Sequence, residues 1–283
     1  MIYGTIVRTS DLASRLGDPH WVVFDCRHTL TDPDAGRRAY AREHIPAARF
    51  AHVEEDLSEH SRPGAGRHPL PDPHRFAEKL GRWGVGDSTQ VVVYDDSFGS
   101  MAVRMWWMLK WLGHEAVALL DGGLPKWKRE GRPLTADPPE IFPTVFPRST
   151  GARSMWVDAR EAAEGMAKGT IRLIDARSPE RFHGEKETID PVAGHVPGAV
   201  NHPFEDNLGL DGTFLPPDEL REAYRALLNG VPAEKVVQMC GSGVTACHNL
   251  LAMEIAGLKG ARLYPGSWSE WIADPLRPAA RGE

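Results

Sequence analysis

Short apolar runs alternate along this chain with longer amphipathic ones. Residues 91–94 and 236–239 are short and mostly apolar, a length and composition typical of buried strands. Residues 104–112 and 218–228 place apolar side chains at helical spacing. Buried strands interleaved with helices are typical of a mainly parallel sheet that has helices on both faces. The pattern therefore predicts an α/β protein.

Much of this pattern occurs twice. Four motifs recur in the same order, and the shift between the copies is nearly constant for the first two. Chance similarity of short strand and turn motifs would explain one match but not four in register, so we infer an internal duplication. The matched pairs are residues 22–27 with 172–177, 43–48 with 194–199, 91–95 with 236–240, and 122–127 with 266–271.

A proline-rich stretch separates the two copies. Residues 133–155 contain five prolines and show little helical or strand periodicity, which is the composition expected of an extended linker. The sequence therefore predicts a first domain at residues 1–132, a linker at 133–155 and a second domain at 156–283.

Charge and cysteine content narrow the classes of partner. The 33 basic and 39 acidic residues give a net charge of −6, which opposes attraction to phosphate backbones and to anionic lipid. We therefore expect neither nucleic acid nor a membrane as a partner. Three cysteines in 283 residues are too few for a disulfide scaffold and favour a reducing compartment. Because the N-terminus lacks a charged stretch followed by an apolar one, we expect a cytoplasmic protein.

The most informative motif is the run Cys-Gly-Ser-Gly-Val-Thr at residues 240–245. It follows the predicted strand at 236–239 and precedes a helix expected at 247–255. Backbone N–H groups and the positive end of a helix stabilise an anion at such a crossing, so Cys240 is placed to act as a nucleophile. The alternative is a buried cysteine that packs as a small apolar side chain. Glycine and hydroxyl residues next to the thiol are more typical of a loop than of a core.

These motifs resemble those of the two-domain rhodaneses and, within that family, the 3-mercaptopyruvate sulfurtransferases. The similarity extends from the Asp-Cys-Arg motif at residues 25–27 to the Gly-Ser-Trp motif at 266–268, and it includes the Gly-His-Val-Pro-Gly-Ala run at 194–199. The resemblance implies two tandem rhodanese-like domains, each a mainly parallel sheet flanked by helices.

The same resemblance implies double displacement at Cys240. The thiolate would take a sulfane sulfur from a small-molecule donor, hold it as a persulfide and pass it to an acceptor thiol or cyanide. In the first copy, Asp95 occupies the position that corresponds to Cys240, and the loop that follows it is one residue longer. An aspartate cannot carry the sulfur. We therefore expect the first domain to be non-catalytic. Backbone groups expected to bind the sulfur belong to Gly241, Gly243, Val244 and Thr245.

The loop residues bear on the identity of the donor. In the thiosulfate branch of the family the two positions after the nucleophile resemble Arg and Lys, whereas this chain has Gly241 and Ser242. A neutral pair suits a larger organic thiol better than a compact dianion. In the mercaptopyruvate branch a loop serine handles a proton together with a histidine and an acid, which match Ser242, His68 and Glu54 here. The alternatives are that His68 is an exposed loop residue and Glu54 a solvated carboxylate.

The resemblance also assigns a residue to the donor carboxylate. By position the family's arginine matches Arg181, whose planar guanidinium suits a carboxylate, and the alternative is a surface salt bridge. The mercaptopyruvate enzymes carry a second arginine a few residues further on, but residues 184–191 offer only Lys186 as a base. This departure keeps thiosulfate open as the donor.

Two other classes of function remain to be weighed. A cysteine phosphatase needs an arginine six residues after its nucleophile, where this chain has Ala246, so the main phosphate clamp is missing. A non-catalytic, sulfur-sensing rhodanese module is the second alternative, and the intact loop around Cys240 argues against it. We expect no metal, because no Cys or His cluster has ligand spacing, and no other cofactor. The acceptor thiol could belong to a thioredoxin-like reductant.

Overall fold

The computed structural model describes residues 2–60, 63–147 and 149–282, and it divides into two compact units. The first unit consists of Met1–Glu59, Leu70–Ala152 and Leu210–Thr213, and the second of His60–Pro69, Arg153–Gly209 and Phe214–Glu283. Two short segments, residues 60–69 and 210–213, thus belong to a different unit from their sequence neighbours. The domain boundaries predicted above remain a prediction.

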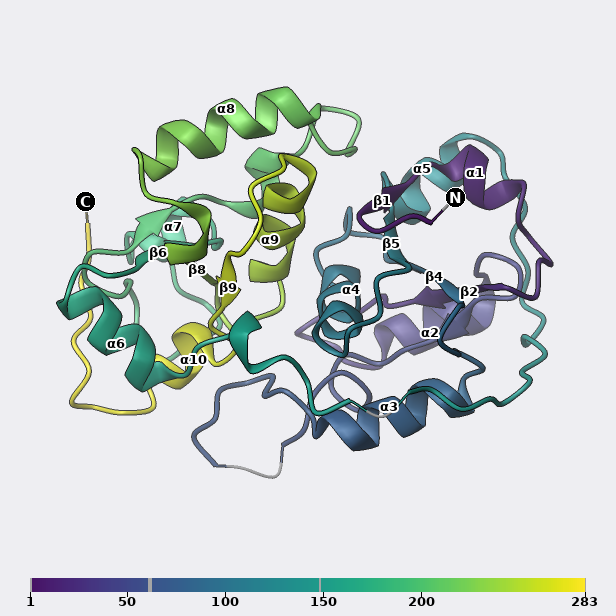
Figure 1. Cartoon of the computed structure of the whole chain (residues 1–283), viewed down its shortest axis with the longest axis horizontal. Coiled ribbons are helices and arrows are strands. Elements are labelled where there is room, and N and C mark those ends of the chain that lie inside the picture. The colour runs from purple at the N-terminus through teal and green to yellow at the C-terminus, as the bar shows by residue number, and fades with distance from the viewer. Residues whose placement is uncertain (1, 61–62, 148, 283) are drawn as a thin grey trace. The chain divides into compact units, whose positions relative to one another are not determined.

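The first unit is built on a five-stranded sheet in the order β1-β5-β4-β2-β3 (Figure 1). Every pairing in this sheet is parallel. The central strand β4 (Gln90–Tyr94) is buried at every position, as its valine-rich sequence predicts. The other strands are β1 (Ile6–Val7), β2 (Trp21–Asp25), β3 (Arg49–Phe50) and β5 (Val117–Leu120).

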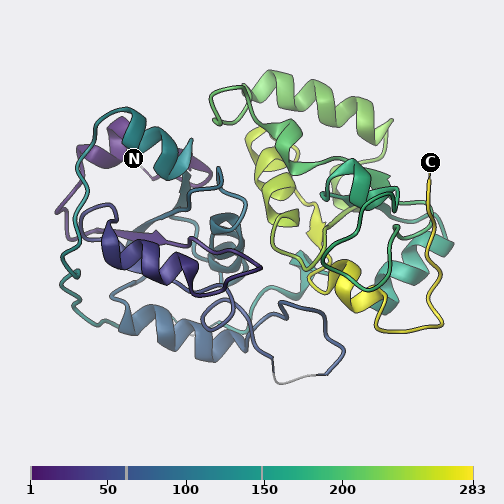
Figure 2. The same ribbon diagram turned by 180° about the vertical axis from the view of Figure 1, so that it is seen from behind.

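Helices cover the sheet of the first unit. Helix α4 (Ala102–Trp111) packs on β4 and β5 and is buried at every position except Lys110. Figure 2 shows α2 (Ala35–Arg42) in front of the strands. Val92 and Trp127 belong to the core of this unit. The remaining helices are α1 (Thr9–Ala13), α3 (Pro73–Arg82) and α5 (Gly123–Arg129).

The second unit is built on a four-stranded parallel sheet in the order β7-β6-β8-β9. Strand β8 (Val236–Met239) is buried at every position and matches β4, because each lies between the strand of the Asp-x-Arg motif and the last strand of its sheet. The other strands are β6 (Arg172–Asp175), β7 (Val200–Asn201) and β9 (Arg262–Leu263).

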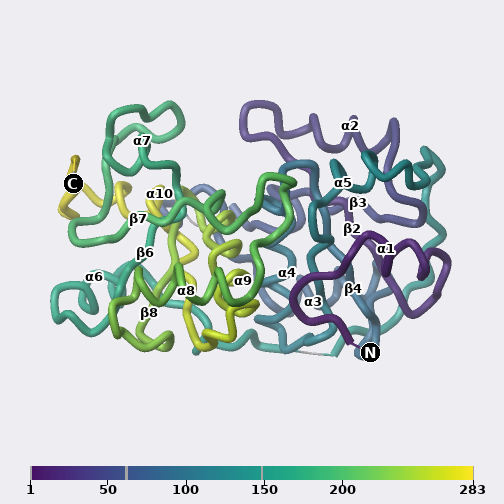
Figure 3. The backbone as a smooth tube through the Cα atoms, turned by 90° about the horizontal axis from the view of Figure 1, so that it is seen from above, coloured from purple at the N-terminus to yellow at the C-terminus, as the bar shows by residue number. Residues whose placement is uncertain are grey.

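Helix α9 (Ala246–Ile255) follows β8 and packs against it. Helix α8 (Pro217–Leu228) lies beside α9, as Figure 3 shows. Both helices occur where the sequence predicts them. The remaining helical segments of the unit are η1 (Arg153–Met155), α6 (Ala159–Ala167), α7 (Pro179–Phe182), η2 (Phe204–Asn207), η3 (Ala233–Lys235) and α10 (Ser267–Trp271).

The duplicated Asp-x-Arg motif forms the same buried ion pair in both units. Nη2 of Arg27 lies 2.6 Å from Oδ2 of Asp25, and Nη2 of Arg177 lies 2.8 Å from Oδ2 of Asp175. All four side chains are almost fully buried. Together with the matching strand orders, this confirms the predicted fold class, which is two tandem α/β domains with parallel sheets flanked by helices.

Other sequence expectations concern the linker and the membrane. Residues 133–147 and 149–152 contain no helix or strand apart from a single bridge between Thr135 and His44. Among the helices of the described residues, none has both the length and the apolar character that a membrane crossing requires.

Candidate active site

Cys240 immediately follows β8, at the carboxyl end of a parallel strand, where such sheets bind ligands. Its side chain is buried, with 2% of the residue exposed. Its backbone N–H donates to Oγ of Ser267 over 3.1 Å, and its carbonyl oxygen accepts from the amide of Trp268 over 3.0 Å. The start of α10 therefore fixes the main chain of Cys240 through two hydrogen bonds.

The loop after Cys240 depends on glycine at position 243. Gly243 has a φ of +75°, and a Cβ atom built on it would lie 2.2 Å from the carbonyl oxygen of Pro265. Only glycine fits this position without a shift of backbone. The same residue donates its N–H to Sγ of Cys240 over 3.2 Å. Gly243 is thus one of the predicted loop residues whose amide contacts the sulfur of Cys240.

The remaining loop residues continue into the helix. Gly241 and Val244 are buried, while Thr245 is half-buried and occupies the N-cap position of α9. The positive end of α9 therefore begins within the loop that carries the thiol. The part of these three residues in binding the sulfur stays a prediction.

Ser242 and His68 are neighbours. Nδ1 of His68 lies 2.7 Å from Oγ of Ser242, and both residues are buried, with 1% and 6% exposed. His68 belongs to the segment 60–69, which lies in the second unit. His68 is therefore not an exposed loop residue, and its ring is within hydrogen-bond distance of the loop hydroxyl.

Glu54 belongs to the first unit. Its Oε1 lies 3.8 Å from Nε2 of His28, whose side chain is fully buried, while the Glu54 side chain is 29% exposed. The predicted pairing of Glu54 with His68 and Ser242 joins residues of two units, and it stays a prediction.

Arg181 lies in α7 and is held by two carboxylates. Its Nε lies 3.1 Å from Oε2 of Glu187, and its Nη2 lies 2.8 Å from Oδ2 of Asp190. The two carboxylate side chains are only 3% and 2% exposed, whereas that of Arg181 is 19% exposed. Arg181 therefore forms ion pairs with buried acids while its side chain stays partly exposed.

Arg67 joins the same cluster and was not singled out from the sequence. Its Nη1 lies 2.7 Å from Oδ1 of Asp190, so one carboxylate bridges Arg67 and Arg181. A Cβ atom built on Gly241 would lie 3.1 Å from Nη2 of Arg67 and 3.5 Å from Nη1 and Nη2 of Arg181. In the sequence, Arg67 stands directly before His68, but this position gives no reason to expect Asp190 nearby.

Glu187 organises the loop behind these arginines. Burial raises the pKa of Glu187, but hydrogen bonds from the amides of Asp190 and Ile189 and from Arg181 outweigh burial and hold it below its ordinary value of 4.5. Glu187 also lies 3.6 Å from Nη1 of Arg177. Glu187 is therefore ionised at neutral pH. Through Arg177 it connects the Asp-x-Arg motif, which occurs in both copies, to the segment that carries Asp190.

Comparison with known proteins places this site in a family. A family model described as "Rhodanese-like domain" matches residues 9–130 and 158–274. The chain belongs to the rhodanese family. This confirms the family predicted from the nucleophile loop and from the duplicated motifs.

Relatives of this rhodanese carry two kinds of name. It is 50% identical over 280 residues to a "Probable 3-mercaptopyruvate sulfurtransferase" from Pseudomonas aeruginosa, and the alignment covers 98% of each chain. It is 34% identical over 295 residues to a "Thiosulfate sulfurtransferase" from Mus musculus, covering 100% of this chain and 97% of the relative. A solved 3-mercaptopyruvate sulfurtransferase from Leishmania major superposes with a TM-score of 0.82 at 30% identity, covering 95% of this chain and 74% of that one. The rhodanese described here is a sulfurtransferase.

In the first unit of this rhodanese, the loop that corresponds to the nucleophile loop binds the carboxylate of its own Asp95. Asp95 follows β4 as the thiol follows β8. Its Oδ1 accepts the amides of Ser97 and Gly99 over 2.9 and 2.8 Å, and its Oδ2 accepts those of Met101 and Ala102 over 2.8 Å each. Burial raises the pKa of Asp95, although the four amides oppose this shift. An internal carboxylate thus occupies the N–H groups that could bind an anion there.

The other two cysteines of the rhodanese lie in cores. Cys26 is fully buried, and burial, reinforced by the charge of Asp25, raises the pKa of its thiol well above the usual value. Sγ of Cys247 lies 3.5 Å from the carbonyl oxygen of Gly243. All three cysteines are free thiols.

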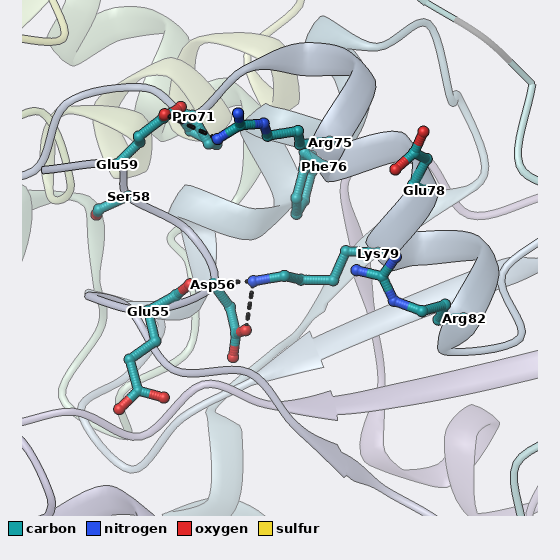
Figure 4. Close-up of a pocket in the computed structure, with 10 residues that line it drawn as sticks. All are labelled: Glu55, Asp56, Ser58, Glu59, Pro71, Arg75, Phe76, Glu78, Lys79 and Arg82. Atoms are coloured by element: carbon teal, nitrogen blue, oxygen red, sulfur yellow. Dashed lines mark hydrogen bonds and ion pairs between the residues drawn. The ribbon is translucent and has the colours of Figure 1, made fainter. Parts of the chain in front are cut away.

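A cavity of about 440 Å³ lies in the first unit between residues 55–59 and α3 (Figure 4). Four of its charged side chains form two pairs: Nζ of Lys79 lies 2.6 Å from Oδ1 of Asp56, and Nη1 of Arg75 lies 3.4 Å from Oε1 of Glu59. None of the residues that line it is a predicted site residue.

Proposed function

We propose that this rhodanese moves a sulfane sulfur from 3-mercaptopyruvate to a thiol or cyanide acceptor through a persulfide on Cys240. The observation that carries the proposal is the pairing of Ser242 with His68 beside the thiol, at 2.7 Å. A hydroxyl hydrogen-bonded to an imidazole can move a proton on a donor thiol, which thiosulfate does not have. The relative named for 3-mercaptopyruvate, at 50% identity, supports the same donor.

The first half-reaction forms the persulfide. The Cys240 thiolate attacks the sulfur of the donor, a new S–S bond forms, and the C–S bond breaks. The electron pair of the C–S bond passes into the enolate of pyruvate. Ser242 and His68 would take the proton of the donor thiol and return it to the enolate carbon, giving pyruvate and a Cys240 persulfide anion. The amide of Gly243 would donate to the anionic sulfur.

The second half-reaction returns the enzyme to its starting state. An acceptor thiol or cyanide attacks the outer sulfur, the S–S bond breaks, and the Cys240 thiolate leaves. With a thioredoxin-like dithiol as acceptor, two thiols become a disulfide and the sulfur departs as hydrogen sulfide. We propose such a reductant as the physiological acceptor. The presence of three free thiols supports a cytoplasmic location for this chemistry.

Thiosulfate is the second candidate donor, and the arginine cluster favours it more than the loop sequence does. The loop itself is neutral, but the guanidiniums of Arg67 and Arg181 lie beside Gly241 and could bind an anion. Measurement of kcat/KM for both donors decides between them. A higher value for 3-mercaptopyruvate supports the proposal, and a clear preference for thiosulfate contradicts it.

The persulfide itself is tested by mass spectrometry. After incubation with 3-mercaptopyruvate, we expect the wild-type protein to gain ~32 Da on Cys240 and to lose this mass on treatment with cyanide. Cys240→Ala should abolish the gain and the turnover, while Cys26→Ala, which changes a core thiol of the first unit, should retain both. An inert wild-type protein would instead support the non-catalytic, sulfur-sensing module.

A further inference from the structure

Two guanidiniums converge on one face of the nucleophile loop. Nη2 of Arg67 and both terminal nitrogens of Arg181 are the nearest atoms to the empty side-chain position of Gly241. We propose that Arg67 is the second arginine that binds the carboxylate of the donor, together with Arg181. This inference rests on the proposed function, because it needs a donor that carries a carboxylate.

A shared counter-ion fixes the separation of the two arginines. Oδ1 of Asp190 accepts from Nη1 of Arg67, and Oδ2 accepts from Nη2 of Arg181. The Asp190 side chain is 2% exposed, whereas those of Arg67 and Arg181 are 25% and 19% exposed. The shared carboxylate is thus almost fully buried, while both arginine side chains stay partly exposed and place terminal nitrogens beside Gly241.

The main chain of Arg67 is also held in place. Its amide N–H donates to Oγ of Ser269 in α10 over 2.9 Å, and α10 is the helix whose start fixes the backbone of Cys240. The same short helix therefore positions the nucleophile and the backbone of Arg67. A donor carboxylate held by Arg67 would have a fixed place relative to the thiol.

Charge balance indicates how the donor would be bound. The three arginines of the cluster, Arg67, Arg177 and Arg181, face three carboxylates, Asp175, Glu187 and Asp190. Because the charges balance, binding depends on directed N–H groups of the guanidiniums rather than on excess positive charge. A lysine at position 67 keeps the charge but offers no planar pair of donors, so it should not replace the arginine.

Glycine at position 241 allows the two guanidiniums to approach the loop closely. Any side chain there would approach Arg67 to 3.1 Å, which is tighter than ordinary van der Waals contact. The segment 184–191, in contrast, supplies no arginine, and its Lys186 is exposed. Arg67 therefore provides from a distant part of the sequence the second guanidinium that this segment lacks.

The test compares a carboxylate ligand with its neutral amide. Pyruvate and pyruvamide differ in the group that Arg67 is proposed to bind, and both can be assayed as inhibitors of sulfur transfer from 3-mercaptopyruvate. We expect Arg67→Ala to raise the KM for 3-mercaptopyruvate and the inhibition constant of pyruvate roughly 10- to 100-fold, as loss of charge-assisted hydrogen bonds predicts. The inhibition constant of pyruvamide and the kcat should change less than about 3-fold.

Two further variants separate binding from folding. Arg67→Lys should stay close to Arg67→Ala in its pyruvate affinity. Arg160→Ala removes an exposed arginine of α6 that pairs with Glu164, and it should leave all constants unchanged. If Arg67→Ala does not fold, Arg67→Gln takes its place in the same comparison.

The outcomes that overturn the inference are distinct from those that overturn the proposed function. Equal weakening of pyruvate and pyruvamide would show that Arg67 only supports the loop, and unchanged pyruvate affinity would show that it does not touch the carboxylate. Either result, with a wild-type protein that forms the Cys240 persulfide, overturns the Arg67 assignment alone. Absence of the persulfide in the wild type with 3-mercaptopyruvate overturns the proposed function and this inference with it.

Discussion

At the scale of single residues, the geometry around the thiol depends on a position without a side chain. Gly243 adopts a left-handed backbone conformation, packs against Pro265 and directs its amide at Sγ of Cys240. An added methyl group must displace the main chain on one side of this contact. The loop that holds the sulfur is therefore sensitive to the smallest possible substitution.

The first prediction concerns this glycine. Gly243→Ala should lower kcat/KM on the order of 100-fold, because a shift of the loop misplaces the amide and the thiol. Gly230→Ala is the matched control, since Gly230 has a φ of +83° in the same unit and open space around its Cβ position. Both variants carry the left-handed strain of about 1–2 kcal/mol, but only Gly243→Ala carries the clash. Equal activity in the two variants would contradict the assigned role.

The residues of the site differ in how far the sequence could reveal them. Cys240 and Ser242 lie in one contiguous motif, and His68 could be matched to a family pattern. Arg67 stands next to His68, yet its ion pair with Asp190 joins segments far apart in the chain. Spacing along the sequence carries no information on such a contact. Only a three-dimensional arrangement could bring Arg67 and Arg181 to the same carboxylate.

At the scale of elements, the segment that follows α7 acts as a support for the arginines. Glu187 accepts hydrogen bonds from the amides of Ile189 and Asp190 and from Arg181. This single carboxylate therefore shapes the turn and orients the guanidinium. Its ionisation should affect the stability of the whole segment.

The second prediction follows from the lowered pKa of Glu187. Because the folded pKa lies below the ordinary value of 4.5, the stabilisation is fully present above about pH 4.5 and is lost as the pH falls below it. Glu187→Gln should lower the free energy of unfolding by roughly 1 to 3 kcal/mol at pH 7. The difference from wild type should shrink in acid. Denaturant unfolding at pH 7 and pH 3.5 measures both values.

Glu185→Gln is the control for this experiment. Glu185 lies in the same segment but is exposed, so its substitution should change stability little at either pH. A Glu187→Gln variant whose deficit is equal at the two pH values would contradict the proposed origin of the stabilisation in the charge.

At the scale of the whole molecule, each unit has its own hydrophobic core. One core includes Val92 and Trp127, and the other includes Val237 and Trp268. The duplication visible in the sequence appears again as two sheets with matching central strands. A substitution that destabilises one unit should therefore speed hydrogen exchange in that unit and leave exchange in the other unchanged.

The third prediction uses the buried carboxylate of the first unit. Asp95→Ala leaves the four amides that it now binds without an acceptor, which should destabilise that unit on the order of 3 kcal/mol. Hydrogen exchange should accelerate at residues 97–102 and in β4 and β5, while β6 and β8 keep their protection. Asp96→Ala, at the exposed neighbour, should change neither. Equal acceleration in both sheets would contradict separate cores.

The fold was more accessible to sequence reasoning than its details were. Strands β4 and β8 come from short, mostly apolar runs, and α4 and α8 come from segments with helical spacing, so their positions could be predicted. The edge strands β1, β3, β7 and β9 have two residues each, too few to form a pattern. The grouping of residues 60–69 with the second unit could not be foreseen either, because that segment has no apolar periodicity of its own.

The carboxylate of Asp95 also limits how the first unit could acquire a reactive sulfur. A mutation to cysteine at that position would remove the acceptor for four amides and would leave a loop one residue longer than the working one. A substitution to cysteine would lose these hydrogen bonds, and a deletion would also be needed to match the loop length of the second unit. A point mutation at position 95 alone therefore does not reproduce the nucleophile loop of the second unit in the first.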